Sequence, residues 1–393
     1  MTEILILGAG YTGMAATMGL AGRLSGRDDV RITLVNPQTR FTERLRLHQT
    51  ASGQSLADLR IPDRLAPTGV EFVRGWVTGI DADARTVRID DAVTLRYDFL
   101  VFALGSVADT QAVPGADEFA YTLNSAQDAT LLAAQLARMP DGTVIVAGGG
   151  LTGVESAAEI AEQHPDLDVV LLSRQEPGSM MGERARARLH AGLDRLGVSV
   201  RTGADIVKVM SDGVALADGK VVPAGAVLWT AGVRVSPVAA AGGLRADDHG
   251  RIITDASLRS VSHPNVYAVG DAAAIQQGYG VVHGTCQSGI PTALHAAASI
   301  VRELKGKQPK TFRFGYLHQP VSLGRNDAVI QFTHPDDSPK RLYLAGPLAV
   351  AYKETVSSSP WPTYRLLRTL PGLGSSTWRR GGQVTRPTTS RSR

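Results

Sequence analysis

The chain has 393 residues, of which 43% are hydrophobic, so it is long enough to bury large cores and to divide into two or three domains. No apolar run is long enough to span a bilayer and the N-terminus does not resemble a secretory leader, so we expect a cytoplasmic protein. The single cysteine, Cys286, excludes an internal disulfide, a redox-active cysteine pair and a cysteine-built zinc site, and we expect no metal centre.

The formal net charge of +4 is concentrated at the end of the chain. Seven arginines and no acidic residues follow Glu354, which leaves the preceding part with a formal charge of −3. We therefore expect no nucleic-acid partner. Residues 375–393 are polar and rich in Ser, Thr and Arg, a composition typical of a disordered basic tail. A basic arm for phosphates or anionic lipid is the alternative.

A glycine-rich turn of the GxGxxG type follows the opening apolar run, ILIL, and precedes a helix of small residues. In a Rossmann unit the first glycine permits a tight turn, the second lets a pyrophosphate approach, and the third allows close helix packing. The free N–H groups of the helix then face the phosphates. We assign this turn to a dinucleotide, and the predicted binding residues are Gly8, Gly10, Tyr11, Thr12 and Gly13. The next strand ends at Asn36, whose amide can hydrogen-bond a ribose.

The same pattern recurs in VIVAGGGLTGVESAAEIAEQHPDLDVVLLSRQE. The predicted binding residues of this second turn are Gly148, Gly150, Leu151, Thr152 and Gly153. An NAD-binding unit usually presents an acidic residue at the end of the second strand, but here that strand ends at Ser173 and Arg174. Arg174 suits a bidentate contact to the 2′-phosphate of NADPH. The alternatives are a solvent-facing arginine and a displaced ribose acceptor, Glu176.

Three further segments accompany the two turns: YDFLVFALGS (97–106), AVLWTAGVR (226–234) and NVYAVGDAAA (265–274). Together the motifs resemble the FAD-dependent pyridine nucleotide-disulfide oxidoreductase superfamily, and within it the type II NADH:quinone oxidoreductases and apoptosis-inducing factor-like flavoproteins. The resemblance implies an α/β fold of two Rossmann-type doubly wound domains, one for FAD and one for NADPH or NADH, plus a C-terminal α+β domain. It implies that hydride passes from NAD(P)H to FAD and that electrons then pass to an acceptor.

The predicted domains follow from the order of the motifs. Residues 1–113 and 242–308 form the two parts of the FAD domain, and residues 114–241 form the NAD(P) domain inserted between them. Residues 309–374 form the C-terminal domain and residues 375–393 the tail.

The resemblance also implies further cofactor-binding residues, which are Ala103, Leu104, Gly105, Gly232, Gly270, Asp271, Arg46 and the backbone at Val77. Arg44 is the alternative to Arg46 for a pyrophosphate or flavin contact. Asp271 also suits the N-cap of a helix beginning at Ala272. Glu155 matches the family's acidic residue near the nicotinamide and is the candidate catalytic residue, while an interaction with the helix N-terminus is its alternative role.

Because there is no cysteine pair, electrons must leave the flavin directly for an acceptor. The family's quinone reductases carry a segment resembling AQxAxQ, and here the matching stretch retains Gln287 but has Pro291 at the second glutamine. The strand-like runs that follow, within TFRFGYLHQPVSLGRNDAVIQF, resemble the family's C-terminal β domain. In it Tyr316, His318 and Gln319 are candidates to face the acceptor.

The segment SSSPWPTYRLLRTLPGLGSSTW stands where membrane-bound relatives have long amphipathic helices. Its prolines predict a short helix that packs on the protein or forms a homodimer contact, with at most peripheral membrane contact. We therefore expect an NAD(P)H-dependent flavin oxidoreductase that favours NADPH and reduces a quinone or another small acceptor. The alternatives are a reductase for a ferredoxin-type carrier and an apoptosis-inducing factor-like flavoprotein with a signalling role.

Overall fold

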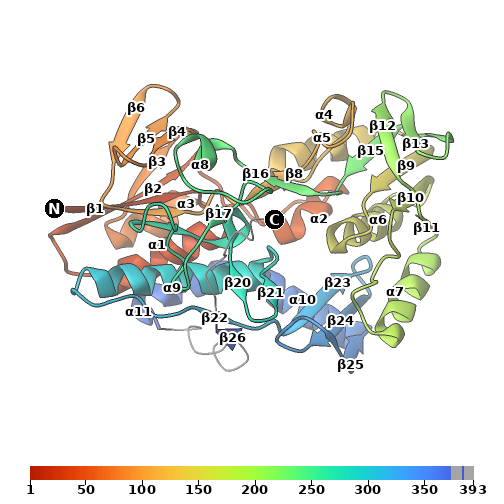
Figure 1. The fold of residues 1–393 in the computed structure, drawn as a ribbon. Helices are drawn as coiled ribbons and strands as arrows, with labels where there is room; N and C mark the ends of the chain where they lie inside the picture. Colours follow the sequence, from red (N-terminus) through yellow and green to blue (C-terminus); the bar gives the residue numbers. More distant parts are fainter. Residues whose placement is uncertain (373–382, 385–393) are drawn as a thin grey trace, which may run out of the picture.

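The computed structural model describes residues 1–372 and 383–384 (Figure 1). Its first sheet is parallel and five-stranded, in the order β18-β7-β1-β2-β3. The strands span Val266–Ala268 (β18), Phe99–Phe102 (β7), Thr2–Leu7 (β1), Val30–Asn36 (β2) and Glu71–Arg74 (β3). In β1, β2, β7 and β18 consecutive residues are buried on both faces, which explains why these strands read as continuous apolar runs, whereas the edge strand β3 is only half-buried.

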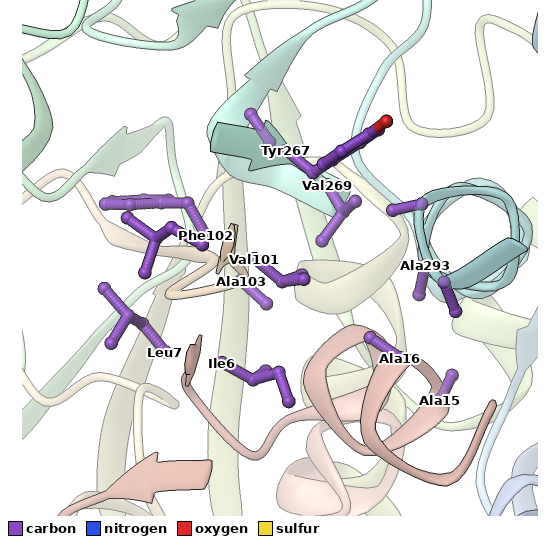
Figure 2. Close-up of a cluster of buried hydrophobic side chains, with 14 of the residues drawn as sticks. Ile6, Leu7, Ala15, Ala16, Val101, Phe102, Ala103, Tyr267, Val269 and Ala293 are labelled. Carbon is purple, nitrogen blue, oxygen red and sulfur yellow. The ribbon is translucent and has the colours of Figure 1, made fainter. Parts of the chain in front are cut away.

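Two helices, α1 (Tyr11–Arg23) and α9 (Cys286–Glu303), pack against each other beside this sheet. Small residues allow the close approach, since a Cβ on Gly19 of α1 would lie 3.3 Å from Leu294 and 3.4 Å from Ala297 of α9. Figure 2 shows the resulting core, in which Ile6 and Val101 from the strands lie near Ala16 and Ala293 from the helices.

The second sheet is also parallel, in the order β11-β10-β9-β15. Its strands span Ser199–Thr202 (β11), Leu167–Ser173 (β10), Gly142–Ala147 (β9) and Ala226–Trp229 (β15). Helix α6 (Leu151–Gln163) connects β9 to β10, as expected for a βαβ unit. Helices α5 (Ala126–Leu136) and α7 (Glu183–Arg195) complete this layer.

Two antiparallel sheets flank the parallel ones. The first contains β4 (Val77–Asp81), β5 (Thr86–Ile89) and β6 (Val93–Arg96). The second contains β12 (Ile206–Met210), β13 (Gly213–Leu216) and β14 (Val221–Pro223). The chain crosses between the two parallel sheets at β8 (Ser106–Ala108) and returns at β16 (Val233–Val235), and these strands pair with each other.

The C-terminal part is an antiparallel sheet followed by two helices. Its strands span His318–Ser322 (β23), Ala328–Thr333 (β24) and Pro339–Ala345 (β25), and the helices span Pro347–Ser358 (α10) and Pro360–Thr369 (α11). Helix α11 packs on α1, where the Tyr364 hydroxyl donates to the Tyr11 carbonyl oxygen at 3.0 Å. Leu367 is buried and Leu366 is exposed, so the amphipathic segment is a helix packed on one face.

The remaining helices and turns of helix are short. They span Arg44–Arg46 (η1), Leu47–Ala51 (α2), Ile61–Leu65 (α3), Ala66–Thr68 (η2), Ala116–Phe119 (α4), Val238–Ala241 (α8) and Gly270–Ala272 (η3). The short strands span Ile252–Ile253 (β17), Ala273–Ala274 (β19), Gln276–Gln277 (β20), Gly280–Val281 (β21), Arg313–Phe314 (β22) and Gln383–Val384 (β26).

The predicted fold class is confirmed, with two doubly wound parallel sheets and a C-terminal α+β unit. One local alternative is wrong. No helix begins at Ala272, because β19 follows there and α9 starts only at Cys286, with Pro291 inside it. The predicted tail lies outside the described residues except for β26, which pairs with β22. The predicted domain boundaries stay predictions. Within the described residues no helix is both long and apolar enough to cross a membrane.

Candidate active site

The first glycine turn has no room for side chains on its inner side. A Cβ on Gly8, whose φ is +92°, would lie 2.6 Å from the Ala103 carbonyl oxygen. A Cβ on Gly13 would lie 1.7 Å from the Gly8 carbonyl oxygen, so helix α1 packs directly on the turn. By contrast, nothing lies within 4 Å of a Cβ built on Gly10. The turn is therefore closed on the side of β7 and open at Gly10, at the N-terminal end of α1.

Helix α1 begins without a side-chain cap at Gly10 and without an acidic residue in its first turn. Its first N–H groups are therefore available to an anion such as a pyrophosphate. Asn36 fixes the turn from the neighbouring strand, since its Oδ1 accepts from Ala9 N at 2.9 Å and its Nδ2 donates to the Gln38 carbonyl oxygen at 2.8 Å. Its contact with a ribose stays a prediction.

The ends of β1, β7 and β18 bring three of the predicted segments together. A Cβ on Gly270 would lie 2.8 Å from Thr12 Oγ1, and Gly270 N donates to Thr292 Oγ1 of α9 at 3.0 Å. Asp271 Oδ2 accepts from Ser106 Oγ at 2.7 Å, directly after the ALG turn of residues 103–105. The turn, the ALG segment and the GD segment therefore lie together at the carboxyl ends of the strands, which is where parallel sheets bind ligands.

The two candidate arginines occupy different places. Arg44 Nη1 donates to the Ser106 carbonyl oxygen at 2.5 Å, which places it beside the ALG segment. Arg46 instead pairs with Glu354 of α10. The structure places Val77 at the start of β4 and Gly232 just before β16, with φ +72°. Their predicted contacts with cofactors stay predictions.

The second glycine turn repeats the first. A Cβ on Gly153 would lie 1.8 Å from the Gly148 carbonyl oxygen, and a Cβ on Gly150 would meet nothing within 4 Å. Helix α6 also starts with no side-chain cap and no acidic residue in its first turn. At the end of β10, Ser173 is buried against Gly149, whose Cβ would lie 2.2 Å from the Ser173 Oγ.

Arg174, the next residue, is exposed and makes no hydrogen bond or ion pair within the described residues. Glu176 lies close to Arg186 at 3.4 Å and His190 at 3.6 Å, on helix α7. The acidic residue nearest in sequence to the strand end is therefore already engaged with basic side chains.

Glu155, in the second turn of α6, is buried at the junction with the C-terminal part. Its Oε1 lies 2.6 Å from Lys353 Nζ of α10 and accepts from Ser322 N at 3.1 Å and Ser322 Oγ at 3.2 Å. Burial acts to raise the pKa of Glu155, but Lys353, His48 and these hydrogen bonds outweigh it and hold the pKa below its usual value. The carboxylate is therefore charged and fixed by its partners.

Sequence reasoning missed Lys353, because the residue belongs to no motif and lies far from Glu155 along the chain. The one available signal is a lysine that follows the apolar stretch PLAVAY. Two histidines lie near Lys353, the buried His48 and the half-buried His318. Burial and the nearby Lys353 lower the pKa of His48 to about 4 and that of His318 to about 4, so both imidazoles are neutral at pH 7.

Gln287 is hydrogen-bonded to the start of strand β23, which carries His318, one of the predicted acceptor-side residues. Gln287 Nε2 donates to the His318 carbonyl oxygen at 2.8 Å, and its Oε1 accepts from Leu317 N at 2.6 Å. His318 Nδ1 lies 2.5 Å from the hydroxyl oxygen of Tyr352, beside Lys353. The hydroxyl of Tyr316 accepts from His283 N at 2.9 Å.

Gln319 is buried in β23 and lies opposite Gln331 in the sheet register, on the face opposite to that of His318, and its contact with an acceptor stays a prediction. Cys286 starts helix α9, and burial raises the pKa of its thiol to about 11. At neutral pH this thiol is protonated, which does not suit a nucleophile.

The family profile described as pyridine nucleotide-disulphide oxidoreductase matches residues 2–299 of the chain. A NADH dehydrogenase-like protein of Mycobacterium tuberculosis is 31% identical over 355 residues, which cover 84% of this chain and 87% of the relative. The demethylphylloquinone reductase NdbB of Synechocystis is 27% identical over 92% of this chain and 93% of its own. The sulfide:quinone oxidoreductase of Aquifex aeolicus has a TM-score of 0.79 at 17% identity, over 96% of this chain and 93% of its own, and this likeness concerns the fold alone.

This chain belongs to the pyridine nucleotide-disulphide oxidoreductase family. It is an NAD(P)H-dependent flavoprotein oxidoreductase. The first glycine turn fits FAD, because helix α1 packs directly on the turn at Gly8 and Gly13 and its uncapped start at Gly10 is open to a pyrophosphate.

Proposed function

We propose that this protein transfers hydride from NADPH to bound FAD and passes the electrons to a small quinone-type acceptor. The FAD, when bound, supplies the two-electron chemistry, while the chain binds and orients the partners. The names of the relatives support a quinone, since one reduces demethylphylloquinone. The polar side chains of His318 and Tyr352, which contact each other, support a polar acceptor on this side.

The choice of NADPH rests on the end of strand β10. A carboxylate at that position would repel a 2′-phosphate, whereas Ser173 is uncharged and Arg174 is an exposed guanidinium that no described carboxylate neutralises. Glu176, the only nearby acid in sequence, faces Arg186 and His190 instead. Arg174 therefore has the charge, the exposure and the position to hold the 2′-phosphate.

The experiment measures kcat/KM for NADPH and NADH in wild type and in Arg174→Ala, with a quinone, ferricyanide and oxygen as acceptors. We expect wild type to favour NADPH. Arg174→Ala should lower kcat/KM for NADPH roughly ten- to a hundredfold, mainly through KM, because charge-assisted hydrogen bonds contribute ~1.5–3 kcal/mol. Use of NADH should change little.

The matched control is Arg138→Ala, which removes an exposed arginine of the same domain beyond the end of α5. It should leave the ratio of NADPH to NADH efficiency unchanged. Equal efficiency with both nucleotides in wild type would contradict the choice of NADPH. Negligible turnover with every acceptor would contradict the proposed activity as a whole.

A further inference from the structure

A pocket of about 170 Å³ lies where helices α1 and α9, which pack against each other, both end (Figure 1). Four basic residues line it, namely Arg23 of α1, His295 and Arg302 of α9, and Lys310 of the segment after α9. The other lining residues are Ala298, Ser299 and Val301. Within the described part of the chain, no acidic residue lines this pocket, so its wall is strongly positive.

Helix periodicity and helix ends bring these groups together. His295, Ser299 and Arg302 are spaced four and three residues apart, so they share one face of α9. Arg23 and Arg302 both stand in the last turn of their helices, where the helix dipole favours cations. Gly19 has no side chain, which lets Arg23 fold back along α1 and donate from Nη1 to the Gly19 carbonyl oxygen at 2.9 Å.

Backbone carbonyl groups hold the basic side chains in place and use only part of their donors. Arg302 Nε donates to the Gln308 carbonyl oxygen at 2.8 Å. His295 Nε2 lies 2.9 Å from the Lys310 carbonyl oxygen, and this nitrogen donates because a carbonyl oxygen only accepts. Neither Arg23 nor Arg302 forms an ion pair with any described residue. A guanidinium has five N–H donors, so both arginines are fixed and still have donors for a ligand.

The positive charge of the pocket is not compensated by the protein. Burial lowers the pKa of Arg23, and no described carboxylate acts against this effect. Glu303, the acidic neighbour of Arg302, accepts from the Tyr267 hydroxyl of β18 instead. Ser299 is 1% exposed, and its hydroxyl has no hydrogen-bond partner among the described residues, so it is a further donor at the pocket. An anion is the ligand that such a set of donors requires.

We propose that this pocket binds a phosphate group, either the free ion or the phosphate of a lipid headgroup. Arginine forks form paired, charge-assisted hydrogen bonds with phosphate oxygens, and lysine adds a point charge. The pocket is smaller than the roughly 300–1,000 Å³ of sites that enclose a drug-sized ligand, so it suits a phosphate group rather than a whole nucleotide. It lies about 20 Å from the proposed FAD pyrophosphate, at the other end of the 13-residue helix α1, and is independent of the electron acceptor.

Titration calorimetry with inorganic phosphate on the FAD-loaded protein tests the free ion, with chloride at equal ionic strength as the reference anion. The Arg174→Ala background removes the proposed 2′-phosphate site. We expect this protein to bind phosphate, and Arg23→Gln and Arg302→Gln each to raise the Kd at least about tenfold, because each loses charge-assisted hydrogen bonds. The matched control, Lys307→Gln, removes an exposed charge from the segment between α9 and Lys310 and should keep the original Kd.

Co-sedimentation with vesicles tests the lipid source. Vesicles of phosphatidylcholine alone are compared with vesicles that also contain phosphatidic acid, whose headgroup is a phosphate monoester. Binding only to the second kind, reduced in Arg23→Gln and Arg302→Gln and kept in Lys307→Gln, would support the pocket with a lipid headgroup as its ligand. Binding of inorganic phosphate without binding to either vesicle would support the pocket with the free ion as its ligand.

Lys310→Gln replaces an arginine variant that does not fold, because Lys310 is exposed, and it should also raise the Kd. The proposal is overturned if the protein binds neither inorganic phosphate nor vesicles with phosphatidic acid. It is also overturned if Lys307→Gln weakens binding as much as the variants of the pocket do, since that result would mean general attraction to surface charge.

Discussion

Glu155 and Lys353 form a buried ion pair whose members come from α6 and α10, far apart in the chain. Removing one member of such a pair leaves the other charge buried and uncompensated, which typically costs about 3–5 kcal/mol. We expect Lys353→Met to lower the free energy of unfolding by roughly this amount in urea denaturation and to raise the pKa of Glu155. The double variant Glu155→Gln/Lys353→Met should regain most of the loss, and Lys340→Met, at an exposed lysine, should have little effect.

If Lys353→Met were as stable as Lys340→Met, the pair would not be the fixed interaction that the structure shows.

Cys286 is the one cysteine of the chain. Its thiol is protonated at neutral pH, since burial raises its pKa to about 11, and no second cysteine exists to form a disulfide. Cys286→Ser should therefore keep most of the NAD(P)H-dependent activity with every acceptor. Complete loss of activity in a folded Cys286→Ser variant, as judged by circular dichroism, would show that the thiol takes part in the reaction.

At the scale of elements, substitutions at two glycines of the turn between β1 and α1 should affect stability and cofactor binding separately. Gly13→Ala puts a Cβ 1.7 Å from the Gly8 carbonyl oxygen, so α1 must shift and the domain should be destabilised. Gly10→Ala meets no protein atom within 4 Å, and Gly10 has an ordinary φ of −72°. Gly10→Ala should therefore fold normally and yet purify with less FAD, because its Cβ occupies space proposed for the pyrophosphate.

Flavin absorbance per protein and the thermal midpoint of the FAD-free protein measure the two effects separately. Full FAD occupancy in Gly10→Ala would mean that the cofactor lies elsewhere.

Sequence patterns predicted best the elements whose structure is set by residues adjacent in the chain. ILIL and VIVA became buried parallel strands, and each glycine turn became a helix start. The start of α9 was less predictable, because Pro291 favours a helix that begins near it. The helix instead begins at Cys286, where Thr285 and Ser288 form a capping box, and Pro291 lies inside it. Pairs such as Glu155–Lys353 and Arg46–Glu354 depend on how the C-terminal sheet docks, and no local pattern encodes that docking.

At the scale of the whole molecule, two neutral histidines, the buried His48 and the half-buried His318, make the free energy of unfolding depend on pH. The pKa values of His48 and His318 fall from 6.5 to about 4 on folding, so between these values the unfolded chain binds more protons than the folded protein. Their contribution to stability is complete above pH 6.5 and is lost as pH falls towards 4.

The thermal midpoint of wild type should therefore fall more steeply from pH 6.5 to pH 4.5 than that of His48→Gln/His318→Gln. His249→Gln, at an exposed histidine, should follow wild type. Parallel curves for all three proteins would contradict the lowered pKa values.

The packing of α11 on α1 has a consequence for how the protein is made. A Cβ on Gly22 of α1 would lie 2.6 Å from the carbonyl oxygens of Leu367 and Arg368, and the Tyr364 hydroxyl holds the Tyr11 carbonyl. The first strand and helix leave the ribosome early, but β18 must follow to complete their sheet and α11 must follow to cover their outer face. Part of the apolar surface of β1 and α1 therefore stays uncovered until α11 has been synthesised. We therefore expect stable capture of FAD to follow the synthesis of α11.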